Sequence, residues 1–309
     1  NNSMKKKILI LGGGISKERL ISLETAKSVF KELKKKNYTA MICEPDGNLI
    51  KKIKKFKPDI VFNALHGQFG EDGYIQIILE SQKVKYTHSG VMASYVAMNK
   101  EISKKIYIKN QILTPKYIKL KFKNNKIDKN IIIKTQKKLK FPAVIKPINE
   151  GSSVNVYICD KKNFIKNLKK LISYKEILIE EFIPGREIQV AILGKRKLGA
   201  IELKPKRKFY DYEAKYNEKA KTKHLIPVDL SEKNLQKVMN IAFKAHTLIG
   251  CRGVTRSDFK FYKGKFFLLE TNTQPGMTKL SLVPEIANYA GMAFIDLIEW
   301  ILKDASTNR

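Results

Sequence analysis

Two acidic residues and an asparagine near the C-terminal end of the chain have types and spacing that suit a divalent metal ion. Asp258 opens the segment Asp-Phe-Lys-Phe, and Glu270 and Asn272 end the segment Leu-Leu-Glu-Thr-Asn. Lys263-Gly264 between the two segments predicts a hairpin turn. Alternate residues of a strand share a face, so Glu270 and Asn272 point the same way.

The register of this hairpin decides whether Asp258 joins them. A three-residue loop centred on Gly264 puts Asp258 directly opposite Glu270, and a two-residue turn shifts the pairing by one position. Two carboxylates and an amide oxygen suit a Mg²⁺ ion that also holds phosphate groups. The alternative is a surface hairpin with solvated acids. The chain has only 29 acidic residues against 61 basic ones, which makes a chance convergence of acids less expected.

Two other segments have residues that suit a nucleotide. Lys146 ends the apolar run Ala-Val-Ile-Lys, and Glu-Gly-Ser-Ser follows at 150–153. Glycine and serine let backbone N–H groups and hydroxyls close on phosphate oxygens, although an ordinary turn has the same composition and no Walker A pattern occurs. The segment 179–187 joins two expected strands, and its backbone with Glu180 and Glu187 could bind an adenosine; solvated glutamates are the alternative.

An aromatic segment, Phe-Tyr-Asp-Tyr-Glu-Ala-Lys-Tyr at 209–216, lies within a long polar loop at 204–228. Loops of this kind fold over active sites as lids, or pack on the body through their aromatic side chains. The sequence leaves both interpretations open.

The elements that must position these residues follow from the hydrophobic pattern. Apolar runs at 5–11 and 59–65 predict buried strands, and a helical spacing begins at Ala26 between them. Strands that alternate with helices predict a parallel α/β lobe over residues 1–98, followed by two α+β lobes over 99–185 and 186–309. The remaining expected elements are helices at 74–81, 100–110 and 232–249, strands at 141–146, 177–182, 187–193, 199–203, 258–262 and 265–270, a Lys- and Asn-rich surface stretch at 121–138, and one closing helix after 275–276.

The composition narrows the class of protein. A net charge of +32 could indicate a nucleic-acid binder, but most of the charge is lysine spread along the chain, which favours a lysine-rich genome as its origin. A smaller part of the positive charge could serve to attract an anionic ligand. The three cysteines have neither metal nor disulfide spacing, which indicates a reducing cytoplasm. The apolar runs are far shorter than the ~20 residues that span a bilayer.

In chain order, a series of motifs resembles the D-alanine:D-alanine ligase family of the ATP-grasp superfamily. They cover residues from about 7 to 300 and include Gly-Gly-Gly-Ile-Ser-Lys-Glu-Arg at 12–19, His-Gly…Gly-Glu-Asp-Gly at 66–73, Ser-Gly-Val…Met-Asn-Lys at 89–100, Gly-Arg-Glu at 185–187, Tyr-Asp-Tyr-Glu-Ala-Lys-Tyr at 210–216, Gly-Cys-Arg-Gly at 250–253, and Asn-Thr-Gln-Pro-Gly-Met-Thr at 272–278 with Ser-Leu-Val-Pro at 281–284. The resemblance implies an ATP-grasp fold that grips ATP between its central and C-terminal lobes. It also implies ATP-dependent joining of two D-alanines through a D-alanyl phosphate, for peptidoglycan synthesis in the cytoplasm, without a nucleic-acid or membrane partner, and with a homodimer as one option.

The resemblance implies a role for individual residues. Glu18 would hold the ammonium of the first D-alanine with His66 close by, and the second carboxylate would meet Ser281 and Leu282. Tyr216 would bond to Ser152 as the aromatic loop closes, and the reaction's oxyanion would meet Arg256 and the N–H of Gly276. The ATP contacts would come from Lys100, Lys146, Glu180, Phe182, Ile183, Glu187 and Lys215. Two Mg²⁺ ions, or Mn²⁺, would be held by Asp258, Glu270 and Asn272.

Five residues depart from the family pattern without removing a catalytic group: Ile77, His88, Asn99, Asn155 and Thr271. Asparagine tolerates a positive φ angle, so Asn155 is expected to keep the loop shape of the glycine that is usual there. The departures put the geometry of the nucleotide loop, and so the rate, more in doubt than the reaction.

Two other interpretations stay open at this point. A ligase that accepts D-lactate as its second substrate is one, and Tyr216 argues against it because similar ester-forming ligases change this position. A basic nucleic-acid-binding protein without catalysis is the other, and the intact set of Lys, Arg and acidic residues in the motifs argues against it.

Overall fold

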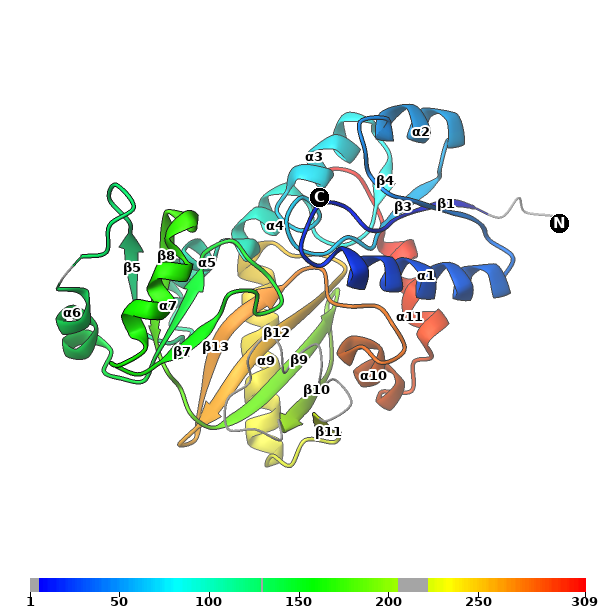
Figure 1. Cartoon of the computed structure of the whole chain (residues 1–309). Helices are drawn as coiled ribbons and strands as arrows, with labels where there is room; N and C mark the ends of the chain where they lie inside the picture. The colour runs from blue at the N-terminus through cyan, green and yellow to red at the C-terminus, as the bar shows by residue number, and fades with distance from the viewer. Residues whose placement is uncertain (1–5, 129, 205–221) are drawn as a thin grey trace.

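The computed structural model describes residues 6–128, 130–204 and 222–309, and its first part is the expected parallel α/β lobe (Figure 1). Four strands form a parallel sheet in the order β2-β1-β3-β4. Ile8 to Leu11 have no exposed surface, because helices cover the sheet and a strand buried on both faces needs an uninterrupted apolar run. The strands are β1 (Lys7–Leu11), β2 (Thr39–Cys43), β3 (Ile60–Asn63) and β4 (Lys85–Tyr86), and the helices are α1 (Arg19–Lys35), α2 (Leu49–Phe56) and α3 (Tyr74–Ser81).

The central part of the chain forms an antiparallel sheet in the order β5-β8-β6-β7, with its own apolar core. Its elements are β5 (Tyr117–Lys121), α6 (Ile131–Lys138), β6 (Ala143–Pro147), β7 (Tyr157–Cys159), α7 (Phe164–Lys170), the short 3-10 turn η1 (Ile172–Tyr174) and β8 (Glu176–Glu181). The stretch 121–138 differs from the expected surface segment, since it ends in helix α6. Ile131 and Thr135 of this helix are buried, while its lysines face outward.

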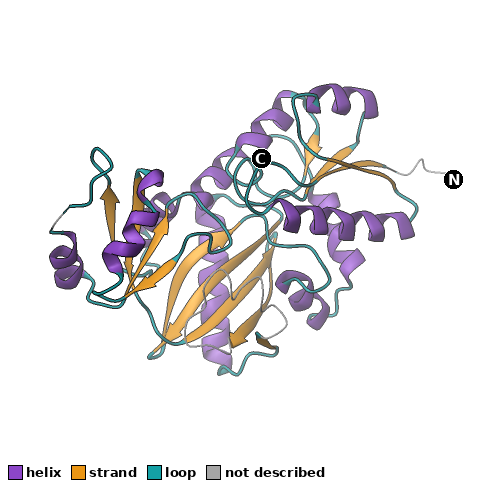
Figure 2. Cartoon of the chain, in the orientation of Figure 1, coloured by secondary structure: helices purple, strands orange, loops and turns teal. Residues whose placement is uncertain are grey.

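A five-stranded antiparallel sheet, β11-β10-β9-β12-β13, occupies the C-terminal part, and one long helix crosses one of its faces (Figure 2). The elements are β9 (Arg186–Leu193), β10 (Arg196–Lys204), β11 (Lys223–Leu225), α9 (Glu232–Ile249), β12 (Val254–Tyr262), β13 (Lys265–Asn272), α10 (Leu282–Tyr289) and α11 (Phe294–Asp304). The single closing helix of the prediction was wrong, because a turn at Gly291, whose φ is +81°, separates two helices. The expected loop at 204–228 contains β11, and its aromatic segment lies outside the described residues.

Helices α4 (Val91–Met98) and α5 (Lys100–Lys109) lie at the expected boundary between the first two lobes. Ala93, Ala97 and Tyr107 belong to the same apolar cluster as α9 and β9, so both helices are packed against the C-terminal sheet. Asn99 caps α5, since its Oδ1 accepts the N–H groups of Glu101 and Ile102 at 3.1 Å each. An aspartate accepts these bonds in the same way, so this departure leaves the local structure intact.

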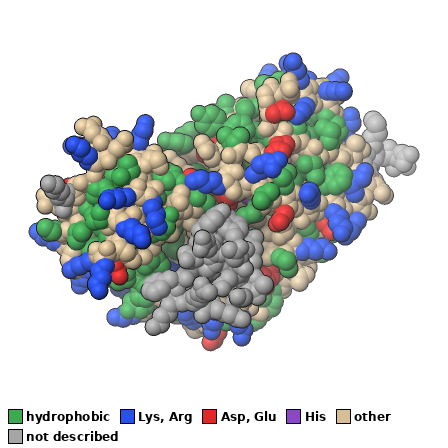
Figure 3. Space-filling model, viewed as in Figure 1, with side chains coloured by type: hydrophobic (Ala, Val, Ile, Leu, Met, Phe, Trp, Pro, Cys, Tyr) green, Lys and Arg blue, Asp and Glu red, His purple; other side chains and the backbone are tan. Residues whose placement is uncertain are grey.

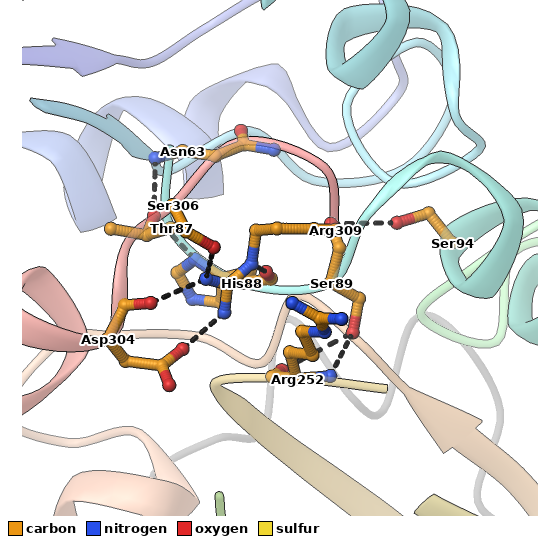
Figure 4. Close-up of polar contacts among 9 residues, drawn as sticks. All are labelled: Asn63, Thr87, His88, Ser89, Ser94, Arg252, Asp304, Ser306 and Arg309. Atoms are coloured by element: carbon orange, nitrogen blue, oxygen red, sulfur yellow. Dashed lines mark hydrogen bonds and ion pairs between the residues drawn. The ribbon is translucent and has the colours of Figure 1, made fainter. Parts of the chain in front are cut away.

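The first lobe and the C-terminal sheet share a continuous core, in which Ile8 and Val29 pack in one cluster with Val283 and Leu297. Arg309 adds a polar connection between them (Figure 4). Its Nε donates to the carbonyl oxygen of His88 at 2.6 Å, and its other nitrogens donate to the carbonyl and carboxylate of Asp304. The loop that precedes α4 is therefore fixed to the end of α11.

Lysine and arginine side chains are scattered over both ends of the visible face rather than gathered in one stripe (Figure 3). The sequence-based expectation that nucleic acid is not a partner stays a prediction. Within the described residues, no helix has the length and apolar character that a membrane crossing needs.

Candidate active site

The hairpin of β12 and β13 brings Asp258 opposite Glu270. The turn has two residues, since Tyr262 pairs with Lys265, so the second of the two turns that the sequence left open is the one observed. An irregularity in the register between Asp258 and Phe259 adds the missing position, as a β-bulge does. Asp258 therefore lies opposite Glu270, as the three-residue turn would have placed it, although here a bulge and not the turn produces the pairing.

Both carboxylates of the hairpin face cations. Arg256 donates from Nε to Asp258 Oδ1 at 2.8 Å and from a terminal nitrogen to Oδ2 at 3.1 Å. Burial acts to lower the pKa of Arg256, but the charge and hydrogen bonds of Asp258 outweigh it and raise that pKa. Lys100 Nζ lies 3.2 Å from Glu270 Oε2 and donates to the carbonyl oxygen of Glu150 at 2.5 Å. Each of the two carboxylates is therefore paired with a cationic side chain.

The donor set of the hairpin fits a hard divalent cation. Asp258, Glu270 and Asn272 supply only oxygen, which Mg²⁺ prefers. Asn272 Oδ1 accepts the N–H of Gln274 at 2.8 Å and keeps a second lone pair for another partner. Among the described residues, no group of three or more His, Cys, Asp or Glu side chains is placed to hold a metal ion, so two carboxylates and this amide are what the hairpin offers.

The loop after β6 reaches across to the start of α1. Ser152 Oγ donates to Glu18 Oε1, and Glu18, at the N-terminus of α1, is only 6% exposed. The positive end of the helix dipole favours a carboxylate there. Ser152, Ser153 and Asn155 have φ angles of 48°, 59° and 55°, which non-glycine residues seldom adopt. The positive φ of Asn155 confirms the expectation from the sequence.

Glu71 also belongs to this site, although the sequence interpretation gave it no role. A β-carbon added at Gly151 would lie 2.8 Å from Glu71 Oε1 and 2.9 Å from Glu18 Oε2, so the two carboxyl groups flank the same glycine. Burial raises the pKa of Glu71 well above its usual range, with Glu18 and Glu270 adding to the rise and Lys100 opposing it. The feature of the sequence that could have indicated a role for Glu71 is its position in the Gly-Glu-Asp-Gly motif.

His66 connects the first lobe to the loop that follows β13. Its Nδ1 lies 2.9 Å from the carbonyl oxygen of Gln274, and its Nε2 lies 2.9 Å from Thr25 Oγ1. A carbonyl only accepts, so Nδ1 carries the hydrogen. The His66 ring is buried and bonded at both nitrogens, so its orientation is fixed. Its closeness to the first D-alanine stays a prediction.

Gly276 and Ser281 lie together at the start of α10. A β-carbon at Gly276 would lie 2.8 Å from Ser281 Oγ, which accepts the N–H of Thr278 at 3.0 Å. Ser281 occupies the N-cap position of α10, without a side-chain hydrogen bond to the helix, and Leu282 is the first residue of the helix. The N-terminus of a helix favours an anion, which suits the carboxylate expected at these residues.

Most of the residues that the sequence assigns to ATP binding lie on the two antiparallel sheets or in the connection between them. Lys146 Nζ lies 2.6 Å from Glu180 Oε2, and both side chains are more than nine-tenths buried. Phe182 and Ile183 lie in the connection from β8 to β9, and Glu187 on β9 lies 3.9 Å from Lys260. Lys215 and Tyr216 lie outside the described residues.

One antiparallel sheet carries a buried lysine, and the second carries the acidic hairpin. This arrangement is that of an ATP-grasp protein. The family model described as D-ala D-ala ligase C-terminus matches residues 106–303. The chain is 73% identical to a D-alanine–D-alanine ligase of Pelagibacter ubique, over 99% of this chain and 100% of the relative. It is 43% identical to the same enzyme of Wolbachia pipientis, over 96% of this chain and 94% of the relative.

Solved structures agree with these matches. A crystal structure of the D-alanine–D-alanine ligase from Bacillus anthracis has a TM-score of 0.85 at 32% identity, with 97% of each chain covered. A second structure of that enzyme, complexed with ATP, has a TM-score of 0.83 at 29% identity and the same coverage. The chain therefore belongs to the D-alanine–D-alanine ligase family.

Proposed function

We propose that the protein joins two D-alanine molecules into D-alanyl-D-alanine, a precursor of peptidoglycan, with ATP converted to ADP and phosphate. The observation that carries the proposal is the 73% identity to a D-alanine–D-alanine ligase over 99% of the chain. The site supports it, since electrostatic interactions with Glu71 or with one another connect four of its residues: Glu18, Lys100, Arg256 and Glu270.

The first step activates a carboxylate, which by itself is a poor acylating agent. A carboxylate oxygen of the first D-alanine attacks the γ-phosphorus of ATP, the bond from that phosphorus to the bridging oxygen breaks, and ADP leaves with the electron pair. Glu18 binds the ammonium of this D-alanine, and Ser152 holds the Glu18 carboxylate in place. Lys100 and Lys146, together with Lys215 outside the described residues, offset the charge of the phosphates.

The second step forms the peptide bond. The amine of the second D-alanine attacks the acyl carbon of D-alanyl phosphate, a tetrahedral oxyanion forms, and its collapse expels phosphate while the amine loses a proton. Asp258 engages Nε and one terminal nitrogen of Arg256, so the remaining N–H groups of that guanidinium are free to meet the oxyanion, together with the N–H of Gly276. One such donor is typically worth ~3 kcal/mol.

Asp258, Glu270 and Asn272 would hold the divalent cations, Mg²⁺ or Mn²⁺. When bound, such ions offset the negative charge that spreads over the transferring phosphoryl group. Lys100, the present partner of Glu270, would then meet the phosphates. Ser281 and the N-terminus of α10 would bind the carboxylate of the second D-alanine.

The experiment that tests this substrate assignment supplies ATP, Mg²⁺, D-alanine and an equal concentration of D-lactate, and separates the products by chromatography. We expect the amide, D-alanyl-D-alanine, to dominate at neutral pH. A product that is mainly the ester D-alanyl-D-lactate would instead assign the protein to the depsipeptide-forming ligases.

A further inference from the structure

Lys104, on helix α5, is a buried lysine that the proposed reaction does not use. Its side chain has no exposed surface, which is rare for lysine, and buried ammonium groups need partners. The Nζ atom donates to Thr114 Oγ1 at 2.8 Å and to the carbonyl oxygen of Pro115 at 3.1 Å, and it lies 2.9 Å from Glu180 Oε1. Two of these oxygens accept hydrogen bonds from the ammonium, and the third, Glu180 Oε1, is its partner in an ion pair.

The carboxylate of Glu180 is shared between two lysines. Its Oε1 faces Lys104, and its Oε2 lies 2.6 Å from Lys146 Nζ. The exposed fraction of the side chain is 0% for Lys104, 2% for Glu180 and 9% for Lys146. Lys146 is therefore the most exposed member of the trio and the one that can carry its charge to a nucleotide.

The charges of the trio do not cancel. Burial lowers the pKa of Lys104 to about 8, although Glu180 opposes this, so the ammonium is still mostly protonated at neutral pH. Burial acts to raise the pKa of Glu180, but Lys104 and Lys146 outweigh it and hold that pKa below its usual value. Two cations and one anion leave one unbalanced positive charge.

We propose that Lys104 is a positioning residue for the nucleotide phosphates: it pairs with one oxygen of Glu180, so that this carboxylate does not fully neutralise Lys146 and the charge of Lys146 can attract ATP. The inference rests on the proposed function, in which Lys146 contacts the phosphates. Without Lys104, Glu180 and Lys146 form a neutral pair, and the buried carboxylate holds the Lys146 ammonium more tightly. The nucleotide site then loses the positive charge that attracts an anionic ligand, and the lost attraction is large because the effective dielectric is low.

The test compares Lys104→Met with Lys105→Met. Lys105 is the next residue on α5, and it is 65% exposed and paired with Glu101, so it is a matched control for the loss of one lysine. Calorimetry with ATP and Mg²⁺ gives the ATP affinity without any turnover, and steady-state assays give KM for ATP, KM for D-alanine and kcat. In Lys104→Met we expect ATP to bind at least about fivefold more weakly, while KM for D-alanine changes by less than about twofold.

Equal ATP affinities in the two variants, or an equal loss for ATP and D-alanine, would show that Lys104 only supports the fold. If Lys104→Met does not fold, Thr114→Val keeps the ammonium and removes one of its acceptors, and it should weaken ATP binding to a smaller degree.

A second variant separates charge from packing. Because both oxygens of Glu180 face lysines and its side chain is only 2% exposed, the carboxylate is not placed to contact the adenosine as the sequence suggested. In Lys104→Met combined with Glu180→Gln, Lys146 regains its unbalanced charge, so ATP affinity should recover toward that of the wild type. A further loss of affinity in the double variant would overturn the proposal. If the wild type binds ATP tightly but forms no dipeptide, the proposed function fails while the role of Lys104 at the phosphates survives.

Discussion

Replacing Gly151 by alanine tests whether Glu18 binds the first substrate. The added methyl carbon would lie 2.9 Å from Glu18 Oε2 and 2.8 Å from Glu71 Oε1, whereas ordinary contacts begin at 3.4 Å. The two carboxylates must therefore move by 0.5 and 0.6 Å, the differences between 3.4 Å and each distance. Both side chains are buried, and Glu18 is tied to Ser152, so neither can turn away freely.

A shift of half an ångström at a substrate-binding group has a measurable cost. A displacement of 1 Å can lower the rate about 100-fold, so we expect KM for the first D-alanine to rise about tenfold, or about 1.4 kcal/mol. The backbone of Gly151 has no positive φ, so alanine brings no backbone strain, and the crowding of the two buried carboxylates should lower the free energy of unfolding by about 1–3 kcal/mol, the usual cost of overpacking.

The assay measures the D-alanine dependence of ADP release in Gly151→Ala and in Gly47→Ala. A β-carbon at Gly47 would meet no atom within 4 Å, so this variant has the same composition change without the crowding. If the two variants have the same KM for D-alanine and both stay folded, Glu18 does not bind the substrate where we propose.

Two further outcomes follow from the structure. Glu270→Gln should abolish ATP turnover while circular dichroism stays that of the wild type, because an amide binds Mg²⁺ more weakly than a carboxylate; near-normal turnover at saturating Mg²⁺ would remove Glu270 from the metal site. Burial lowers the pKa of His88 to about 3 and that of His246 to about 4, while unfolded histidine titrates near 6.5. The unfolded state then binds more protons below pH 6.5, so at pH 5 the stability should be lower by about 2 kcal/mol per histidine than at pH 8, as measured by urea unfolding. In His246→Gln this loss should be about half that of the wild type, and an unchanged loss would contradict the assignment.

Local pattern was enough to predict several elements of the fold. The sequence boundaries of α3 at 74–81 and α9 at 232–249 agree with the structure, since both have strong helical periodicity. Helix α6 was missed because it lies in a Lys- and Asn-rich stretch that was assigned to the surface as a whole. The lobe boundaries at 98 and 185 stay predictions, and α4 and α5 at the first of them pack on the C-terminal sheet, a contact that local sequence does not encode.

The site shows the same division between local and long-range information. The shared face of Glu270 and Asn272 follows from strand alternation, but the pairing with Asp258 depends on a bulge that no residue type signalled. Glu71 and Lys104 were not assigned roles, because their importance comes from burial among residues far apart in the chain. Two of the departures from the family pattern fit their local surroundings: Ile77 is 57% exposed, and His88 adopts a φ of +69°.

The most direct test of the central claim is a coupled measurement of ADP and dipeptide with purified protein. With ATP, Mg²⁺ and D-alanine, we predict one ADP released per D-alanyl-D-alanine formed, and no ADP above background when L-alanine replaces D-alanine. Equal ADP release with both enantiomers, or ADP release without dipeptide, would contradict the assignment of this protein as a ligase of D-alanine.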